Sequence, residues 1–97
     1  MTSKQRAYLI KLASTEPTIL YIGKGGVTPE LTANVDEALT ARELIKIGLQ
    51  QNCMEDPREL SEMLSARTQS TVVKQIGRKI ILYRQGEGKK KKIELPK

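Results

Sequence analysis

The stretch Ile22-Gly23-Lys24-Gly25-Gly26-Val27-Thr28-Pro29 decides the fold, because it joins an apolar strand to a helix through a glycine turn. Glycine adopts positive φ angles readily and lets another molecule approach the main chain. We expect Gly25 to have a positive φ angle. Thr28 suits a helix N-cap and Pro29 the first helical position, so unpaired N–H groups and the positive end of a helix dipole should face the loop. With the ammonium group of Lys24, the stretch predicts a phosphate site, and a purely steric turn is the alternative.

Hydrophobic spacing outward from this stretch predicts three helices and four strands. Helices are expected over residues 2–13 and 29–41, and a third begins at Asp56-Pro57-Arg58-Glu59, with Asp56 as N-cap and Glu59 in a capping-box position. Leu60, Met63 and Leu64 of this third helix should face the core. The runs of apolar and β-branched residues predict strands over residues 18–22, 43–49, 70–76 and 78–84.

The resulting order, α-β-α-β-α-β-β, predicts an α/β sandwich with a four-stranded mixed sheet. The β-α-β steps should make parallel neighbours or leave a gap, whereas the hairpin at Gly77 is antiparallel. The 97 residues suffice for one domain, which we place at residues 1–85. Residues 86–97 are expected to form a basic tail carrying Lys89–Lys92, with a short terminal strand at residues 93–95.

Positive charge is unevenly distributed along the chain. The 17 Lys and Arg exceed the 11 Asp and Glu by six. Residues 30–62 hold eight acids and three bases, whereas residues 67–92 hold nine bases and one acid. This polarisation favours a binding face for nucleic acid or an anionic surface over general solubility. The lone Cys53 cannot form an internal disulfide, and no apolar run approaches the ~20 residues of a membrane span, so we expect a cytoplasmic protein with no membrane partner.

Residues suited to catalysis or metal binding are scarce in this sequence. It has no His, no cysteine pair, and no Ser or Cys nucleophile beside a recognisable base. The glycine stretch lacks the full pattern of a nucleotide-hydrolysing loop or of a dinucleotide fold. We therefore predict no catalytic residue, no metal and no cofactor. Tyr21 and Tyr83 lie in apolar strands and are expected in the core.

Four segments together resemble the CRM domain (chloroplast RNA splicing and ribosome maturation), in its small stand-alone bacterial YhbY-type form. They are Gly23-Lys24-Gly25-Gly26 after a strand, Lys4-Gln5-Arg6 with Leu9 and Leu12-Ala13, Glu43-Leu44-Ile45-Lys46-Ile47, and Ile76-Gly77-Arg78-Lys79-Ile80-Ile81-Leu82-Tyr83-Arg84. The resemblance covers nearly the whole chain. It implies a fold similar to the carboxy-terminal domain of a bacterial translation initiation factor. It also implies an RNA-binding module associated with precursors of the large ribosomal subunit, whose Gly-x-x-Gly loop corresponds to residues 23–26.

We therefore predict a monomeric, non-catalytic protein that binds ribosomal RNA in large-subunit precursors and acts in ribosome assembly. Recognition should depend on phosphates and shape. The alternatives are a nucleotide- or anion-binding enzyme or sensor that uses the same loop, and a nonspecific binder of DNA or anionic surfaces. The predicted RNA-binding residues are Gly23, Lys24, Gly25, Gly26, Thr28, Lys4, Arg6, Lys11, Lys46, Arg78 and Lys79.

Overall fold

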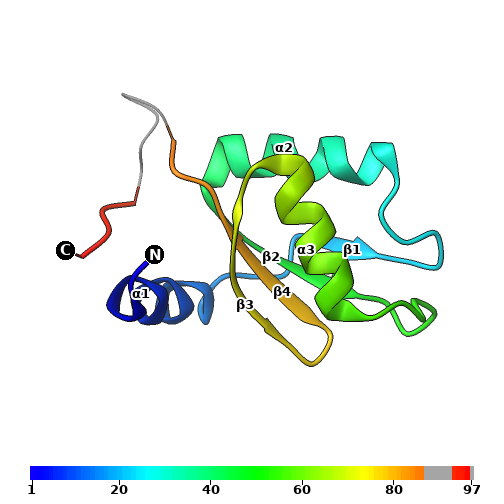
Figure 1. Cartoon of the computed structure of the whole chain (residues 1–97), viewed down its shortest axis with the longest axis horizontal. Coiled ribbons are helices and arrows are strands. Elements are labelled where there is room, and N and C mark those ends of the chain that lie inside the picture. The colour runs from blue at the N-terminus through cyan, green and yellow to red at the C-terminus, as the bar shows by residue number, and fades with distance from the viewer. Residues whose placement is uncertain (87–92, 97) are drawn as a thin grey trace.

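The computed structural model describes residues 1–86 and 93–96, and in these residues three helices and four strands follow the predicted order (Figure 1). The elements are α1 (Ser3–Ala13), β1 (Leu20–Ile22), α2 (Pro29–Arg42), β2 (Leu44–Leu49), α3 (Pro57–Thr68), β3 (Thr71–Ile76) and β4 (Lys79–Tyr83). The predicted α/β class with a four-stranded mixed sheet is confirmed. Among residues 1–86 and 93–96, every helix is too short or too polar to span a bilayer.

The helices begin where short polar side chains accept hydrogen bonds from first-turn amides. Thr28 Oγ1 accepts the Leu31 N–H at 3.0 Å, as its predicted N-cap role requires. Asp56 also caps its helix, but it accepts the Arg58 N–H rather than that of Glu59. The capping box predicted at α3 is therefore wrong, because the aspartate bonds one residue earlier. A reciprocal capping box instead starts α1, between Thr2 and Gln5.

The sheet has the strand order β1-β2-β4-β3. The β1–β2 pair is parallel, and the β2–β4 and β3–β4 pairs are antiparallel. A register row crosses the sheet through Tyr21, Gly48, Lys79 and Ile76, so these residues point to the same face. A register shift between Val72 and Lys74 makes β3 irregular.

Helices cover the two faces of the sheet unequally. α2 and α3 lie over one face, whereas α1 lies on the other face, toward one end of the molecule (Figure 1). The larger buried cluster lies under α2 and α3 and consists of Ile22, Val35, Leu39, Ile45, Ile47, Leu49, Cys53, Leu60, Leu64, Ile80 and Leu82. The smaller cluster lies under α1 and consists of Leu9, Ala13, Leu44, Val73, Ile81 and Tyr83. Among the described residues, α1 covers only part of its face of the sheet, and Tyr21 and Ile76 on that face are exposed.

Met63 does not face the core as predicted. Leu60, Leu64 and Thr68, which are spaced by four residues, are buried, whereas Met63 is 37% exposed. The buried stripe of α3 is narrower than the apolar spacing suggested, because Ser61 occupies the next buried position instead.

Residues 93–96 are irregular, so the expected terminal strand is wrong. Ile93 and Leu95 pack against the cluster under α1. The buried carboxylate of Glu43 accepts the Ile93 N–H at 2.7 Å and also the Gly86 N–H. These contacts hold the segment against the domain without a sheet ladder. The boundary at residue 86 stays a prediction, and Lys89–Lys92 lie outside the described residues.

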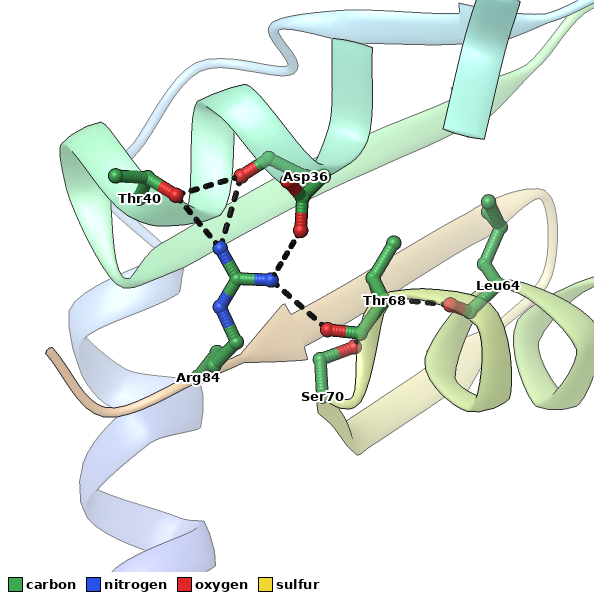
Figure 2. Close-up of polar contacts among 6 residues, drawn as sticks. All are labelled: Asp36, Thr40, Leu64, Thr68, Ser70 and Arg84. Carbon is green, nitrogen blue, oxygen red and sulfur yellow. Dashed lines mark hydrogen bonds and ion pairs between the residues drawn. The ribbon is translucent and has the colours of Figure 1, made fainter. Parts of the chain in front are cut away.

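Arg84, just after β4, joins the two helices that cover the larger cluster (Figure 2). Its guanidinium donates to Asp36 Oδ1 at 2.5 Å, to Asp36 O at 2.9 Å and to Thr40 Oγ1 at 2.7 Å, all on α2. It also donates to Thr68 O, the last residue of α3, at 2.8 Å. One planar side chain therefore binds helix α2 to the end of α3.

Candidate nucleic-acid interface

The glycine loop, residues 23–28, begins with a tight turn. The Gly26 N–H donates to Gly23 O at 3.0 Å, and Gly26 has a φ of +67°. A Cβ at Gly26 would also lie 2.8 Å from a carboxylate oxygen of Glu55. Gly25 has no positive φ, and a Cβ there would meet only the Thr28 methyl at 3.7 Å. The expectation of positive φ at Gly25 is therefore wrong, because the turn places that conformation one residue later.

The loop presents unpaired backbone donors at the start of α2. The N–H groups of Lys24, Gly25, Val27 and Thr28 have no acceptor in the part of the chain that the structure describes. Lys24, Gly25 and Thr28 are exposed, and Thr28 keeps its hydroxyl on the Leu31 amide as the cap. Amide donors next to a helix N-terminus are suited to an anion, because the helix dipole adds partial positive charge there.

A second loop, residues 50–55, packs against the glycine loop. The Gln50 N–H donates to Ile22 O at 2.9 Å, and the Gln50 side-chain oxygen lies 2.8 Å from where a Cβ of Gly23 would be. Glu55 lies against Gly26 in the same way. The sequence contains no signal for these contacts, because they join segments that only the tertiary fold brings together.

Arg78 holds this second loop in place. Its guanidinium donates to Leu49 O at 3.4 Å, to Cys53 O at 2.9 Å and also to Gln50 O. The Leu49 N–H in turn donates to Arg78 O at 2.8 Å. Arg78 therefore stabilises the conformation of the 50–55 loop. We call the region formed by the glycine loop, the 50–55 loop and Arg78 the loop end of the molecule.

Lys79 and Tyr21 lie on the open part of the sheet face beside the loop end. Lys79 Nζ donates to Thr18 Oγ1 at 3.0 Å and lies 5.6 Å from the centroid of the Tyr21 ring. Lys46 is half-buried on the same face. Tyr83 is buried as predicted, but Tyr21 is 53% exposed, so its predicted core position is wrong. The reason is that α1 covers the sheet over Tyr83 and not over Tyr21.

The predicted basic residues of α1 lie apart from the glycine loop. α1 and the loop between β1 and α2 are at opposite ends of the long axis (Figure 1). Lys4 and Lys11 are exposed there. Arg6 is half-buried, and its guanidinium donates to Val72 O at 2.8 Å and to Val73 O, which fixes α1 to β3. The structure therefore brings Gly23 to Thr28, Arg78 and Lys79 into one region, and it does not bring Lys4, Arg6 and Lys11 there.

The local charge of the loop end is mixed. Lys24 is the cation of the glycine loop, whereas Glu30 lies in the first turn of α2 and Glu55 lies against Gly26. An anion at the loop would depend on backbone amides as well as on Lys24. Within residues 1–86 and 93–96, no group of three or more acidic, histidine or cysteine side chains is arranged to hold a metal.

Comparison with known proteins identifies relatives over the full length. The chain is 41% identical over 96 residues to the Bacillus subtilis protein named "Probable RNA-binding protein YqeI", covering 99% of each chain. It is 29% identical over 97 residues to a Haemophilus influenzae protein named "RNA-binding protein", covering 100% of this chain and 96% of the other. The solution structure of the Staphylococcus aureus protein SAV1595 matches with a TM-score of 0.82 and 43% identity, over 99% of each chain.

The family model that matches is the CRS1 / YhbY (CRM) domain, over residues 1–84. The match includes all seven helices and strands, the glycine loop and the 50–55 loop. It confirms the resemblance that the four sequence segments indicated. This chain therefore belongs to the CRS1 / YhbY (CRM) domain family.

Proposed function

We propose that this protein binds RNA without catalysing a reaction, that the glycine loop contacts the phosphate backbone, and that the protein acts on precursors of the large ribosomal subunit. The family and the names of its relatives support the RNA partner. The net charge of +6 supports binding to a polyanion.

One observation carries the role of the glycine loop: the N–H groups of Lys24, Gly25, Val27 and Thr28, which precede α2, lack an acceptor among the described residues, and the Lys24 side chain is exposed beside them. A phosphate oxygen is a strong acceptor, and its negative charge is favoured at a helix N-terminus. The loop would bind the backbone of RNA irrespective of sequence, because amides and an ammonium group contact phosphate and not base edges.

The remaining predicted residues divide into two groups by position. Lys79 lies on the sheet face near the loop end and would extend the phosphate path from Lys24. Lys46 is half-buried on the same face, opposite Ile81 of β4, and would contact a phosphate further along the sheet. Lys4 and Lys11 would contact a separate stretch of RNA, because the molecule is 39 Å long and α1 lies at its other end. Arg6 and Arg78 would contribute mainly by holding α1 and the 50–55 loop in position.

Substitution at Gly25 tests the loop. An aspartate there adds a carboxylate at the proposed phosphate position, and its Cβ fits without strain. We expect Gly25→Asp to weaken RNA binding roughly tenfold or more at low salt, with little change in melting temperature. Gly25→Asn, which has the same shape without the charge, is the matched control and should bind nearly as the wild type does.

Lys24→Ala provides a second measure, because it should reduce the slope of log affinity against log salt by about 0.7–0.9, the share of one phosphate contact. RNA titration over a salt series gives both the affinity and the salt slope of each variant. A folded Gly25→Asp protein that binds RNA as tightly as Gly25→Asn would rule out the loop as the phosphate site.

The role in ribosome assembly needs a separate experiment. On a sucrose gradient of cell lysate, the protein should sediment with large-subunit precursors at low salt and be released at high salt, because its contacts are mainly ionic. Sedimentation only with free protein would contradict the assembly role. Specific binding of a mononucleotide by the isolated protein would favour the alternative of a nucleotide sensor.

A further inference from the structure

A shallow hollow of about 540 Å³ lies beside the glycine loop. Its lining residues are Tyr21, Leu49, Gln50, Gln51 and Asn52. Gln50 belongs to both sites, because its side-chain oxygen also lies against Gly23. Tyr21 precedes Gly23 by two residues. A ligand in the hollow would therefore be adjacent to a phosphate held by the loop.

The Tyr21 ring lies beside a position that has no side chain. Gly48 is directly opposite Tyr21 in the parallel β1–β2 pair, and a Cβ at Gly48 would lie 3.0 Å from Cε1 of the ring and 3.1 Å from Lys79 Nζ. The ring and the ammonium group thus converge over a glycine. Covering a glycine in a neighbouring strand is a known stabilising use of an aromatic residue. Covering Gly48 would explain the position of the Tyr21 ring, but it requires neither a hollow beside the ring nor unpaired polar groups in that hollow.

The hollow also contains amide groups without partners. The side chains of Gln51 and Asn52 are exposed and form no hydrogen bond within residues 1–86 and 93–96. Each amide carries both a donor and an acceptor, which matches the alternating donors and acceptors on the edge of a nucleobase. An aromatic ring, free amides and a nearby ammonium group are the components by which proteins bind unpaired bases of single-stranded RNA.

We propose that the hollow binds one unpaired RNA base, with Tyr21 stacking on the base and Gln51 and Asn52 bonding its edge. The proposal rests on the proposed function, since the adjoining phosphate would lie at the glycine loop. The base site adds a requirement for unpaired RNA that the glycine loop alone does not impose. Phosphate contacts at the loop are compatible with duplex RNA, whereas stacking on Tyr21 requires a base that is not paired.

The test compares a short single-stranded RNA with a duplex of the same sequence. Tyr21→Ala should weaken binding of the single strand by about 5- to 150-fold, the effect of removing a base-stacking aromatic residue, and leave duplex binding unchanged. The salt slope should stay the same because no charge is removed. Tyr21→Phe keeps the ring and should bind as the wild type does. Tyr8→Ala, which removes an exposed tyrosine from α1, is the matched control.

The amides are tested by the double variant Gln51→Ala/Asn52→Ala, which should weaken single-strand binding by about 2- to 12-fold, the value of one neutral hydrogen bond. Thermal melting identifies any variant that loses its fold, and Tyr21→Leu, which keeps an apolar side chain beside Gly48 without an aromatic ring, then replaces Tyr21→Ala in the comparison. If the wild type binds neither RNA, the proposed function fails. If the wild type binds and Gly25→Asp weakens it, but Tyr21→Ala keeps full single-strand affinity, only the base site is overturned.

Discussion

The hydroxyl of Tyr83 is buried under α1 and has no hydrogen-bond partner among the described residues. Burial raises the pKa of Tyr83 above its ordinary value of 10.0, and the nearby carboxylate of Glu43 raises it further. The folded protein thus holds the phenolic proton more tightly than the unfolded chain does. The titration of Tyr83 therefore leaves the free energy of unfolding unchanged below about pH 10, and it lowers that free energy as the pH rises from there through the pKa of the folded protein.

Tyr83→Phe should remove that part of the alkaline loss of stability. At neutral pH we expect the variant to be as stable as the wild type or up to about 1–3 kcal/mol more stable, because no unbonded hydroxyl is buried. Urea denaturation of the two proteins at neutral and alkaline pH measures both effects. Equal alkaline slopes for the two proteins would contradict this explanation.

Glu55 is an exposed carboxylate that lies against Gly26 in the proposed phosphate site. Glu55→Gln should raise RNA affinity at low salt by up to about fivefold, because an exposed charge contributes at most about 1 kcal/mol. The gain should shrink at high salt as screening increases. Glu37→Gln, on an exposed position further along α2, is the control and should change affinity less. An equal gain in both variants would indicate a general charge effect.

The two strand tyrosines show what a sequence can predict about a single residue. Tyr21 and Tyr83 have similar apolar neighbours, so the pattern assigned both to the core. Which of them is buried depends on where α1 lies on the sheet, and that position depends on contacts such as Arg6 with the β3 carbonyls. Residue identity alone does not contain this information. The conformation of Gly26 depended in the same way on the turn that the chain formed.

At the scale of elements, the sequence predicted more, because the signals are local. The Thr28 cap and Pro29 set the start of α2 as expected. The predicted strand ends differ from those in the structure by one or two residues, since end positions depend on which partner residues are available for pairing. The contact between the 50–55 loop and the glycine loop was not predictable, because no periodicity or cap links segments that are about 28 residues apart.

Arg84 allows a prediction about how elements are held together. Arg84→Ala removes a side chain that bonds α2 and the end of α3, and it should cost about 2–3 kcal/mol in the free energy of unfolding. Arg84→Lys should recover little of this, because one ammonium group cannot match the planar fork. Asp36→Asn is the control: it removes only an exposed ion pair and should cost about 1 kcal/mol or less. Urea denaturation of the three variants gives their free energies of unfolding. An Arg84→Ala protein as stable as the wild type would contradict the role of Arg84 in holding the two helices together.

At the scale of the whole molecule, the predicted basic residues of α1 lie in a separate group from those of the loop end. α1 and the loop end lie at opposite ends of a molecule 39 Å long. Charge counts show that basic residues are unevenly distributed along the sequence, but they could not show that Lys4 and Lys24 are far apart. RNA that contacts both groups must extend along the molecule.

The lysines of the tail are a further basic group along the chain. Replacing Lys89–Lys92 with serine should weaken binding of all RNAs alike and lower the salt slope by up to about 0.7–0.9 for each phosphate that these lysines neutralise. Titration of a ribosomal RNA fragment and of a random RNA measures whether the preference between them changes. A loss of preference would mean that the lysines contribute to specificity. Substitution is a better test than deletion, because Gly86 and Ile93 are bonded to Glu43.

The two outer strands of the sheet have a consequence for association between copies of the chain. β1 is only three residues long, and β3 carries an irregular register and the exposed Lys74. Edge strands that are short, irregular or charged offer few aligned backbone N–H and C=O groups with which a strand of another molecule could pair. We therefore expect the protein to remain monomeric as its concentration rises, which light scattering coupled to size exclusion would measure. A chain that does not add its sheet to that of a neighbour can be concentrated without forming aggregates through its strands.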